Sequence, residues 1–182
     1  INRTTRLLRQ ILEVRKSQAG QLHLLVSRGN LISFIEDACE NIRPMAEHQQ
    51  VTLSLEKPKT EGAAWFDADK IDKIIYNLLS NAIKYNKVGG KIKVSLSLSK
   101  DQAVITIKDN GIGMSKEKMK HLYTRFFDGD YRKQNQPGTG IGLSLTHDLV
   151  KLHHGNIQCE SQEGEGTTFT ITLPIRKSAY AP

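Results

Sequence analysis

Apolar residues recur along this chain at two different spacings, one typical of helices and the other of strands. Where they recur every three or four positions, one face of a helix is apolar and can be buried against a core. Asn30 and Asp67 each stand directly before such a stretch, where an Asn or Asp side chain can cap the first helical turn. The helical spacing predicts helices over residues 31–49, 68–85, 116–125 and 140–153.

Apolar and polar residues alternate in several stretches between these helices, and a strand with one buried face has this period of two. Gly89 and Gly90 turn the chain into the first of two expected hairpins. Strands are expected at residues 51–55, 63–66, 91–98, 102–108, 156–161 and 167–174. The sum is an α+β fold, a two-layer sandwich in which helices cover one face of a mixed sheet of about five strands.

Residues 1–20 form a basic segment that differs from the rest of the chain. Leu8, Ile11 and Leu12 lie at helical spacing, and Gly20 is a suitable helix stop. One helix cannot bury its own apolar stripe. The segment therefore either packs on the rest of the chain or belongs to a larger helical bundle, and we divide the chain into residues 1–20 and residues 21–182.

Composition limits the classes of function. The 182 residues are 38% hydrophobic and 25% charged, which suits a globular protein with one core. The net charge is +7, but the basic residues are dispersed among acids, so we expect no nucleic-acid partner. No apolar run approaches the roughly 18 residues that span a bilayer, and any membrane attachment would lie outside this chain. Cys39 and Cys159 are too few for a zinc motif or a disulfide framework, which suits a reducing cytosol.

The expected helix over residues 68–85 carries polar residues beside its apolar face. Asn77 and Asn81 are four residues apart and point from the same side, and Lys84 follows three residues later. Amide oxygens are suitable ligands for a hard cation such as Mg²⁺, and an ammonium suits phosphate. Taken alone, the same residues would equally form a solvated polar stripe.

Two glycine-rich segments follow this helix. Residues 109–113, Asp-Asn-Gly-Ile-Gly, come at the end of an expected strand, where the carboxylate can accept a hydrogen bond from an amine such as that of adenine; a plain turn is the alternative. Residues 138–142, Gly-Thr-Gly-Ile-Gly, open a helix and offer backbone N–H groups to phosphates. The spacing fits neither the dinucleotide fingerprint nor the Walker loop. The order of the three elements is more specific than any one of them, and it predicts a pocket for magnesium-ATP.

In this order the elements resemble the catalytic ATP-binding domain of sensor histidine kinases. The resemblance covers residues from about 31 to 173 and extends to the Bergerat-fold superfamily, which includes gyrase, Hsp90 and the mismatch-repair ATPases. The family's N box is matched by residues 77–85, its G1 box by 109–113, its F box by 125–127, its G2 box by 138–142 and its last glycine box by 164–169.

The resemblance implies a role for each matching residue. Asn81 would bind magnesium, and Asn77 would lie on the phosphate or metal side. Lys84 would contact phosphate and, with Asn77, take part in catalysis. Tyr85 would contact adenine or ribose, and Asp109 would accept a hydrogen bond from the adenine amine. Gly111 and Gly113 would let the ring approach. Thr168 would close the pocket. The remaining nucleotide contacts would come from Gly138, Thr139, Gly140, Ile141, Gly142 and Leu143, with the three glycines around the phosphates.

One departure from the family pattern concerns residues 114–137, which the resemblance implies to be a lid over the nucleotide. Many members have a basic residue directly after the second aromatic of the F box, and Asp128 stands there in this chain. Arg132 or Lys133 would then take over the contact with the γ-phosphate.

The resemblance also separates a kinase from a hydrolase. ATP-hydrolysing members carry a glutamate four residues before the metal-binding asparagine, where it activates water. Asn77 occupies that position here, and an amide takes up no proton at neutral pH. Transfer to a histidine relies on positioning and charge neutralisation instead. We therefore expect a histidine kinase that uses ATP and Mg²⁺.

The acceptor histidine is expected outside this chain, because none of its six histidines lies in the family's acceptor motif. Residues 2–16 resemble the second helix of the dimerisation and phosphoacceptor hairpin of hybrid two-component sensors. The resemblance implies a homodimeric, membrane-anchored parent that holds this domain in the cytoplasm and passes phosphate to the receiver domain of a response regulator. Two alternatives stay open, a serine kinase of the anti-sigma type and a nucleotide-binding regulatory module without transfer activity.

Overall fold

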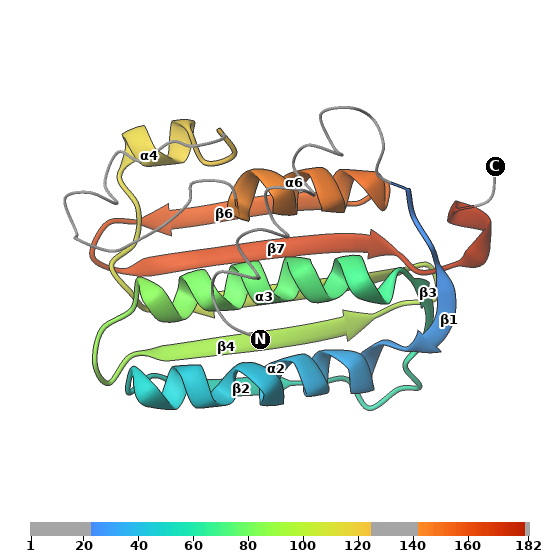
Figure 1. The fold of residues 1–182 in the computed structure, drawn as a ribbon, viewed down its shortest axis with the longest axis horizontal. Coiled ribbons are helices and arrows are strands. Elements are labelled where there is room, and N and C mark those ends of the chain that lie inside the picture. Colours follow the sequence, from blue (N-terminus) through green and yellow to red (C-terminus); the bar gives the residue numbers. More distant parts are fainter. Residues whose placement is uncertain (1–22, 125–141, 181–182) are drawn as a thin grey trace.

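The computed structural model describes residues 23–124 and 142–180, and its elements can be followed from blue to red in Figure 1. The strands are β1 (Ser27–Asn30), β2 (Thr52–Glu56), β3 (Ala63–Phe66), β4 (Lys91–Leu98), β5 (Gln102–Asp109), β6 (Asn156–Gln162) and β7 (Gly166–Pro174). The helices are α2 (Leu31–His48), α3 (Ala68–Lys84), α4 (Lys116–Lys120), α6 (Gly142–Leu152) and the short 3₁₀ helix η1 (Lys177–Ala179).

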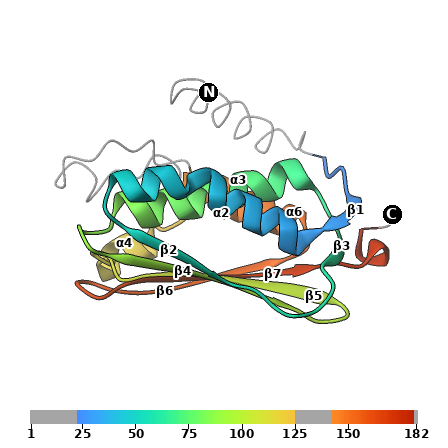
Figure 2. The same cartoon turned by 90° about the horizontal axis from the view of Figure 1, so that it is seen from below.

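Five of the strands form the main sheet in the order β2-β4-β5-β7-β6. β2 runs parallel to β4, whereas the other neighbouring strands are antiparallel, so the sheet is mixed. Figure 2 shows α2, α3 and α6 together over the same face of this sheet. The predicted α+β fold, a two-layer sandwich on a mixed five-stranded sheet, is confirmed.

The core lies between the sheet and the helix layer. Along β5, Ala103, Ile105 and Ile107 are buried, and Val104 and Thr106 between them are partly exposed, which is the alternation expected of a strand with one covered face. Burial of each large aliphatic side chain contributes roughly 1.5–3 kcal/mol. α3 is the central helix of the layer, and its fully buried aliphatic residues are Ile71, Ile74, Ile75, Leu78, Leu79 and Ile83.

α3 begins at a buried ion pair. Asp67 caps the helix as predicted, since its Oδ1 accepts a hydrogen bond from the Lys70 backbone N–H at 3.2 Å. Its Oδ2 accepts the Leu25 backbone N–H at 2.8 Å and lies 3.1 Å from the Lys70 ammonium. Burial would raise the pKa of Asp67, but these donors and the ammonium outweigh burial and hold the pKa below its ordinary value. The groups of the fold itself therefore satisfy this carboxylate.

Most predicted element boundaries agree closely with the observed ones. Asn30 caps α2 as predicted, accepting the Ser33 N–H at 3.0 Å. The strand predicted at 63–66 is present as β3, but it pairs with β1 in a separate two-stranded antiparallel sheet. β1, Ser-Arg-Gly-Asn, was not predicted because it has no apolar alternation. Its extended conformation depends on pairing with β3.

The helix predicted over 116–125 is wrong in its second half. α4 ends at Lys120, where the His121 N–H bonds to the Lys118 carbonyl and the Leu122 N–H to the Met119 carbonyl. This three-residue spacing is the tighter turn that commonly ends a helix. The predicted N-terminal helix and the expected lid beyond residue 124 lie outside the described residues. Within the described ranges, no helix is both long and apolar enough to cross a membrane.

Candidate nucleotide-binding site

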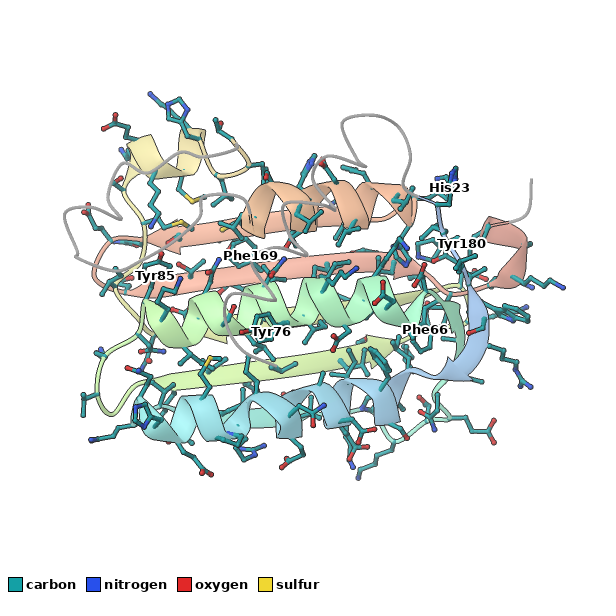
Figure 3. All side chains as sticks on the ribbon, viewed as in Figure 1. His23, Phe66, Tyr76, Tyr85, Phe169 and Tyr180 are labelled. Carbon is teal, nitrogen blue, oxygen red and sulfur yellow. The ribbon has the colours of Figure 1, made fainter. Side chains whose placement is uncertain are left out.

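A pocket opens beside the C-terminal end of α3, bordered by β5, β7, α4 and the start of α6. Its empty volume is about 450 Å³, open solvent included. Figure 3 shows Tyr85 just beyond α3 and Phe169 on β7, away from Phe66 and Tyr180 at the opposite end. The pocket is lined by Leu78, Asn81, Ala82, Tyr85, Asp109, Gly113, Met114, Lys118, Leu143, Thr167 and Phe169.

The two asparagines of α3 have different surroundings. Asn81 lines the pocket. Asn77 is 4% exposed, and its Nδ2 donates to the Gly142 carbonyl and to the Thr146 hydroxyl, both at 3.3 Å. The Thr146 hydroxyl donates to the same carbonyl at 2.8 Å. Asn77 therefore joins α3 to the start of α6, and Asn81 is the asparagine that faces the ligand space.

Asp109 is the last residue of β5, and only one of its carboxylate oxygens accepts hydrogen bonds from the described residues. Its Oδ1 accepts the Gly111 N–H at 2.9 Å and the Thr167 N–H at 3.3 Å. Its Oδ2 accepts no hydrogen bond from the residues that the structure describes. Burial raises the pKa of Asp109 above its ordinary value, although the two N–H donors act in the opposite direction. The side chain is thus held in place as an acceptor at the pocket wall.

Two glycines after β5 allow close packing of the loop against neighbouring backbone. A Cβ at Gly111 would collide with the Tyr85 carbonyl oxygen, and one at Gly113 would collide with that of Gln162. Gly113 also has a φ of 68°, which favours glycine. Gly113 lines the pocket, whereas Gly111 lies outside its wall. The packing of the protein itself therefore requires both glycines.

β7 contributes to the pocket through alternate residues. Thr167 and Phe169 line it, and strand alternation turns Thr168 to the opposite face of the sheet. Thr168 lies opposite Lys108 in the register of β5 and β7. The resemblance implied that Thr168 closes the pocket; in the structure its neighbour Thr167 lines the pocket and Thr168 is not among the lining residues.

Two lysine ammonium groups approach the ring of Tyr85. The Lys118 ammonium lies 4.7 Å from the ring centroid and the Lys84 ammonium 5.6 Å, both within the roughly 6 Å of a cation–π contact. Lys118 lines the pocket and Lys84 stands outside the lining. The structure thus adds Lys118, which the sequence did not indicate.

Sequence reasoning missed several other residues of the pocket wall. Leu78 and Ala82 could have been found, because they lie within four positions of Asn81 and Tyr85 on the same face of one helix. Phe169 had no such signal, because the sequence pointed to Thr168, from which a period of two leads to Thr170. Met114 and Lys118 carry no such signal, because their positions depend on how the chain turns after β5.

The glycine segment that opens α6 is described only in part. The Gly142 carbonyl accepts the amide of Asn77, and Leu143 lines the pocket. The other predicted contacts in this part of the chain lie outside the described residues, namely Arg132, Lys133, Gly138, Thr139, Gly140 and Ile141.

The fold and the pocket together define a class of protein. The sequence predicted an ATP-binding domain from features that the structure contains. These are a mixed sheet under three helices, an asparagine on the central helix and a fixed carboxylate at a strand end. Residues 66–177 match the family of histidine kinase-, DNA gyrase B- and HSP90-like ATPases. The chain belongs to this family.

Similar proteins within the family are sensor histidine kinases. Histidine kinase P4 of Formosa agariphila is 29% identical over 178 residues, which cover 96% of this chain and 13% of that protein. Sensor histidine kinase TmoS of Ectopseudomonas mendocina is 36% identical over 167 residues, covering 91% of this chain and 17% of that protein. The chain therefore spans a small part of these relatives. The predicted resemblance to their catalytic domain is confirmed.

Solved structures of histidine kinases share the fold. Acinetobacter baumannii histidine kinase AdeS superposes with a TM-score of 0.76 at 21% identity, covering 95% of this chain and 79% of that chain. Full-length ShkA in complex with AMPPNP gives a TM-score of 0.80 at 17% identity, covering 91% of this chain and 34% of that chain.

Proposed function

We propose that this domain binds magnesium-ATP and transfers its γ-phosphoryl group to a histidine of a dimerisation and phosphoacceptor domain, as one step of two-component signalling. The observation that carries the proposal is the state of Asp109. Its Oδ1 is held by two backbone N–H groups, and its Oδ2 accepts no hydrogen bond from the described residues. A fixed acceptor in a pocket suits a ligand with an amine, as adenine has.

The other lining residues suit the rest of the nucleotide. Leu78, Met114 and Phe169 give the pocket apolar surface for a flat ring. The amide oxygen of Asn81 is of the type that Mg²⁺ accepts as a ligand. The ammonium group of Lys84 lies beside Tyr85 and brings positive charge to the site of a polyanion. The known fold relative ShkA was solved with an ATP analogue, which supports the same ligand.

Transfer fits this pocket better than hydrolysis. Asp109 is the single carboxylate among the described lining residues, and its assigned role is to hold the base. Asn77, at the position of the general base in hydrolysing relatives, is an amide that donates to Gly142 and Thr146. Bound Mg²⁺ would neutralise the phosphate charge. The work of this chain is then to orient ATP towards a nucleophile supplied by the acceptor histidine.

The remaining partners follow from the proposed class. Residues 1–20 would belong to the second helix of the phosphoacceptor hairpin, and the parent protein would be a homodimer anchored in a membrane with this domain in the cytoplasm. Its phosphoryl group would pass to the receiver domain of a response regulator. The relatives' names as sensor histidine kinases support the phosphoacceptor domain and the response regulator of this proposal.

A reconstituted transfer reaction tests the proposal. The domain is mixed with γ-labelled ATP, Mg²⁺ and a separately produced acceptor hairpin from a sensor histidine kinase, with a His→Gln hairpin as control. We expect acid-labile label on the hairpin alone, and none on the control. Acid-stable label would indicate a serine kinase of the anti-sigma type. ATP binding without transfer would indicate a nucleotide-binding regulatory module.

A further inference from the structure

Lys118 is buried although it lies on a short surface helix. The five residues of α4 include three lysines. Lys116 and Lys120 are exposed, as is usual, whereas Lys118 is 5% exposed. Removing an ammonium from water is costly unless other groups compensate it. The burial of this one lysine therefore needs a reason.

The ring of Tyr85 supplies part of that compensation. The Lys118 ammonium lies 4.7 Å from the ring centroid, and a desolvated cation over a ring is a stronger contact than an exposed one. Ser115 fixes the start of the same turn, because its hydroxyl accepts the Lys118 backbone N–H at 3.1 Å. α4 thus carries a cation to one side of the pocket, against an aromatic ring from another element.

Tyr85 lies where the chain leaves α3. It is the C-cap of α3, with φ −98° and ψ 22°, so it stands past the last regular helical turn. Its carbonyl accepts the Ile112 N–H at 3.0 Å, which fixes the backbone but leaves the ring to be oriented by side-chain contacts. The ammonium groups of Lys118 and Lys84 are two contacts of that ring.

We propose that Lys118 is a positioning residue for nucleotide binding, which holds the Tyr85 ring in the orientation that receives the base. This inference rests on the proposed function and deepens it. Because Lys118 acts through the ring, its contribution is the same for a ligand with three phosphates and for one with none. A lysine that contacted phosphate would contribute more with each added phosphate.

The test compares Lys118→Met, which keeps the length and removes the charge, with Lys118→Arg, which keeps a cation. Lys120→Met on the same helix is the matched control. Calorimetry measures the binding of adenosine, ADP and ATP to each. For Lys118→Met we expect about a 2- to 30-fold weaker Kd for all three ligands alike. Lys118→Arg and Lys120→Met should stay near the unchanged domain.

A double substitution separates positioning from direct contact. In a Tyr85→Leu background, Lys118→Met should change the adenosine Kd no further. Three outcomes would overturn the inference. They are a further loss of adenosine affinity in the Tyr85→Leu background, an unchanged Kd in the single variant Lys118→Met, and a loss of affinity in that variant that grows from adenosine to ATP. In the free domain, the Tyr85 ring proton signals should shift in Lys118→Met and not in Lys120→Met, and Lys118→Gln provides a second variant if the methionine destabilises the fold. If the unsubstituted domain binds none of the three ligands, that result would refute the proposed function instead.

Discussion

A carboxylate and a buried lysine lie near each end of α3, but the two ends differ in whether the carboxylate forms an ion pair. At the start, Asp67 and Lys70 are 3.1 Å apart and form a closed pair. At the end, Asp109 and Lys118 line one pocket, yet Asp109 forms no ion pair within the described ranges. The pKa of Asp67 is lowered by its donors despite burial, whereas burial raises the pKa of Asp109.

This difference separates a carboxylate that the fold satisfies at both oxygens from one that the fold satisfies at a single oxygen. Three groups of the protein donate to Asp67, so nothing is left for a ligand. Among the described residues, Asp109 uses only Oδ1 for the fold, and in our proposal Oδ2 accepts the donor of the ligand. Asp67 is 2% exposed and Asp109 is partly exposed, and the number of satisfied carboxylate oxygens separates the two further.

The largest expected effect is at the closed end. Asp67→Ala removes the cap and leaves the Lys70 ammonium buried without its partner, so the free energy of unfolding should fall by about 3–5 kcal/mol. Urea denaturation followed by circular dichroism measures it. Replacing Lys70 by Met in the same variant should recover part of the loss. A loss below about 1 kcal/mol for Asp67→Ala would show that the pair is not structural.

At the open end, Asp109→Asn should weaken ATP binding by about tenfold to a hundredfold, the worth of a hydrogen bond to a charged group. Because the folded pKa of Asp109 is raised, its ionised form opposes folding at neutral pH, and the neutral amide should not lower stability. Calorimetry and thermal melting are measured together. A purine riboside triphosphate without the amine serves as control, and a loss equal to that for ATP would contradict the assigned contact.

The two asparagines repeat the comparison within one helix. Asn81→Ala should weaken ATP binding about tenfold with Mg²⁺ present and much less in EDTA, since a metal ligand is lost. Asn77→Ala should instead lower stability by about 1 kcal/mol, because its amide joins α3 to α6. Calorimetry with and without Mg²⁺, beside melting curves, measures both. Equal losses with and without metal would remove Asn81 as the ligand.

The smallest expected effect depends on pH. Because the folded pKa of Asp67 is depressed, its charge stabilises the fold fully above its unfolded pKa of about 3.9. That contribution is lost as pH falls through the lower folded value. The stability difference between the unchanged domain and Asp67→Asn should therefore be constant near neutral pH and shrink below about pH 4. A difference that stays constant in acid would show that the stabilisation does not come from the ionised form of Asp67.

Local signals predicted much of this molecule. Asn30 and Asp67 cap the helices for which they were chosen, because capping involves residues three positions apart. The β4–β5 hairpin has its predicted ends within one residue, since Gly89 and Gly90 and a regular alternation mark it. β1 could not be predicted, because a segment without alternation becomes a strand only through its partner β3.

The sequence by itself determined most of the elements, the family and the asparagine, aspartate and glycine residues proposed for the site, because these depend on spacing along the chain. Only the tertiary structure decided which residues face the pocket. Asp109 is fixed by Thr167 from 58 positions away, and Lys118 reaches Tyr85 across the loop after β5. Such contacts depend on packing between distant segments, and packing has no period that a sequence displays.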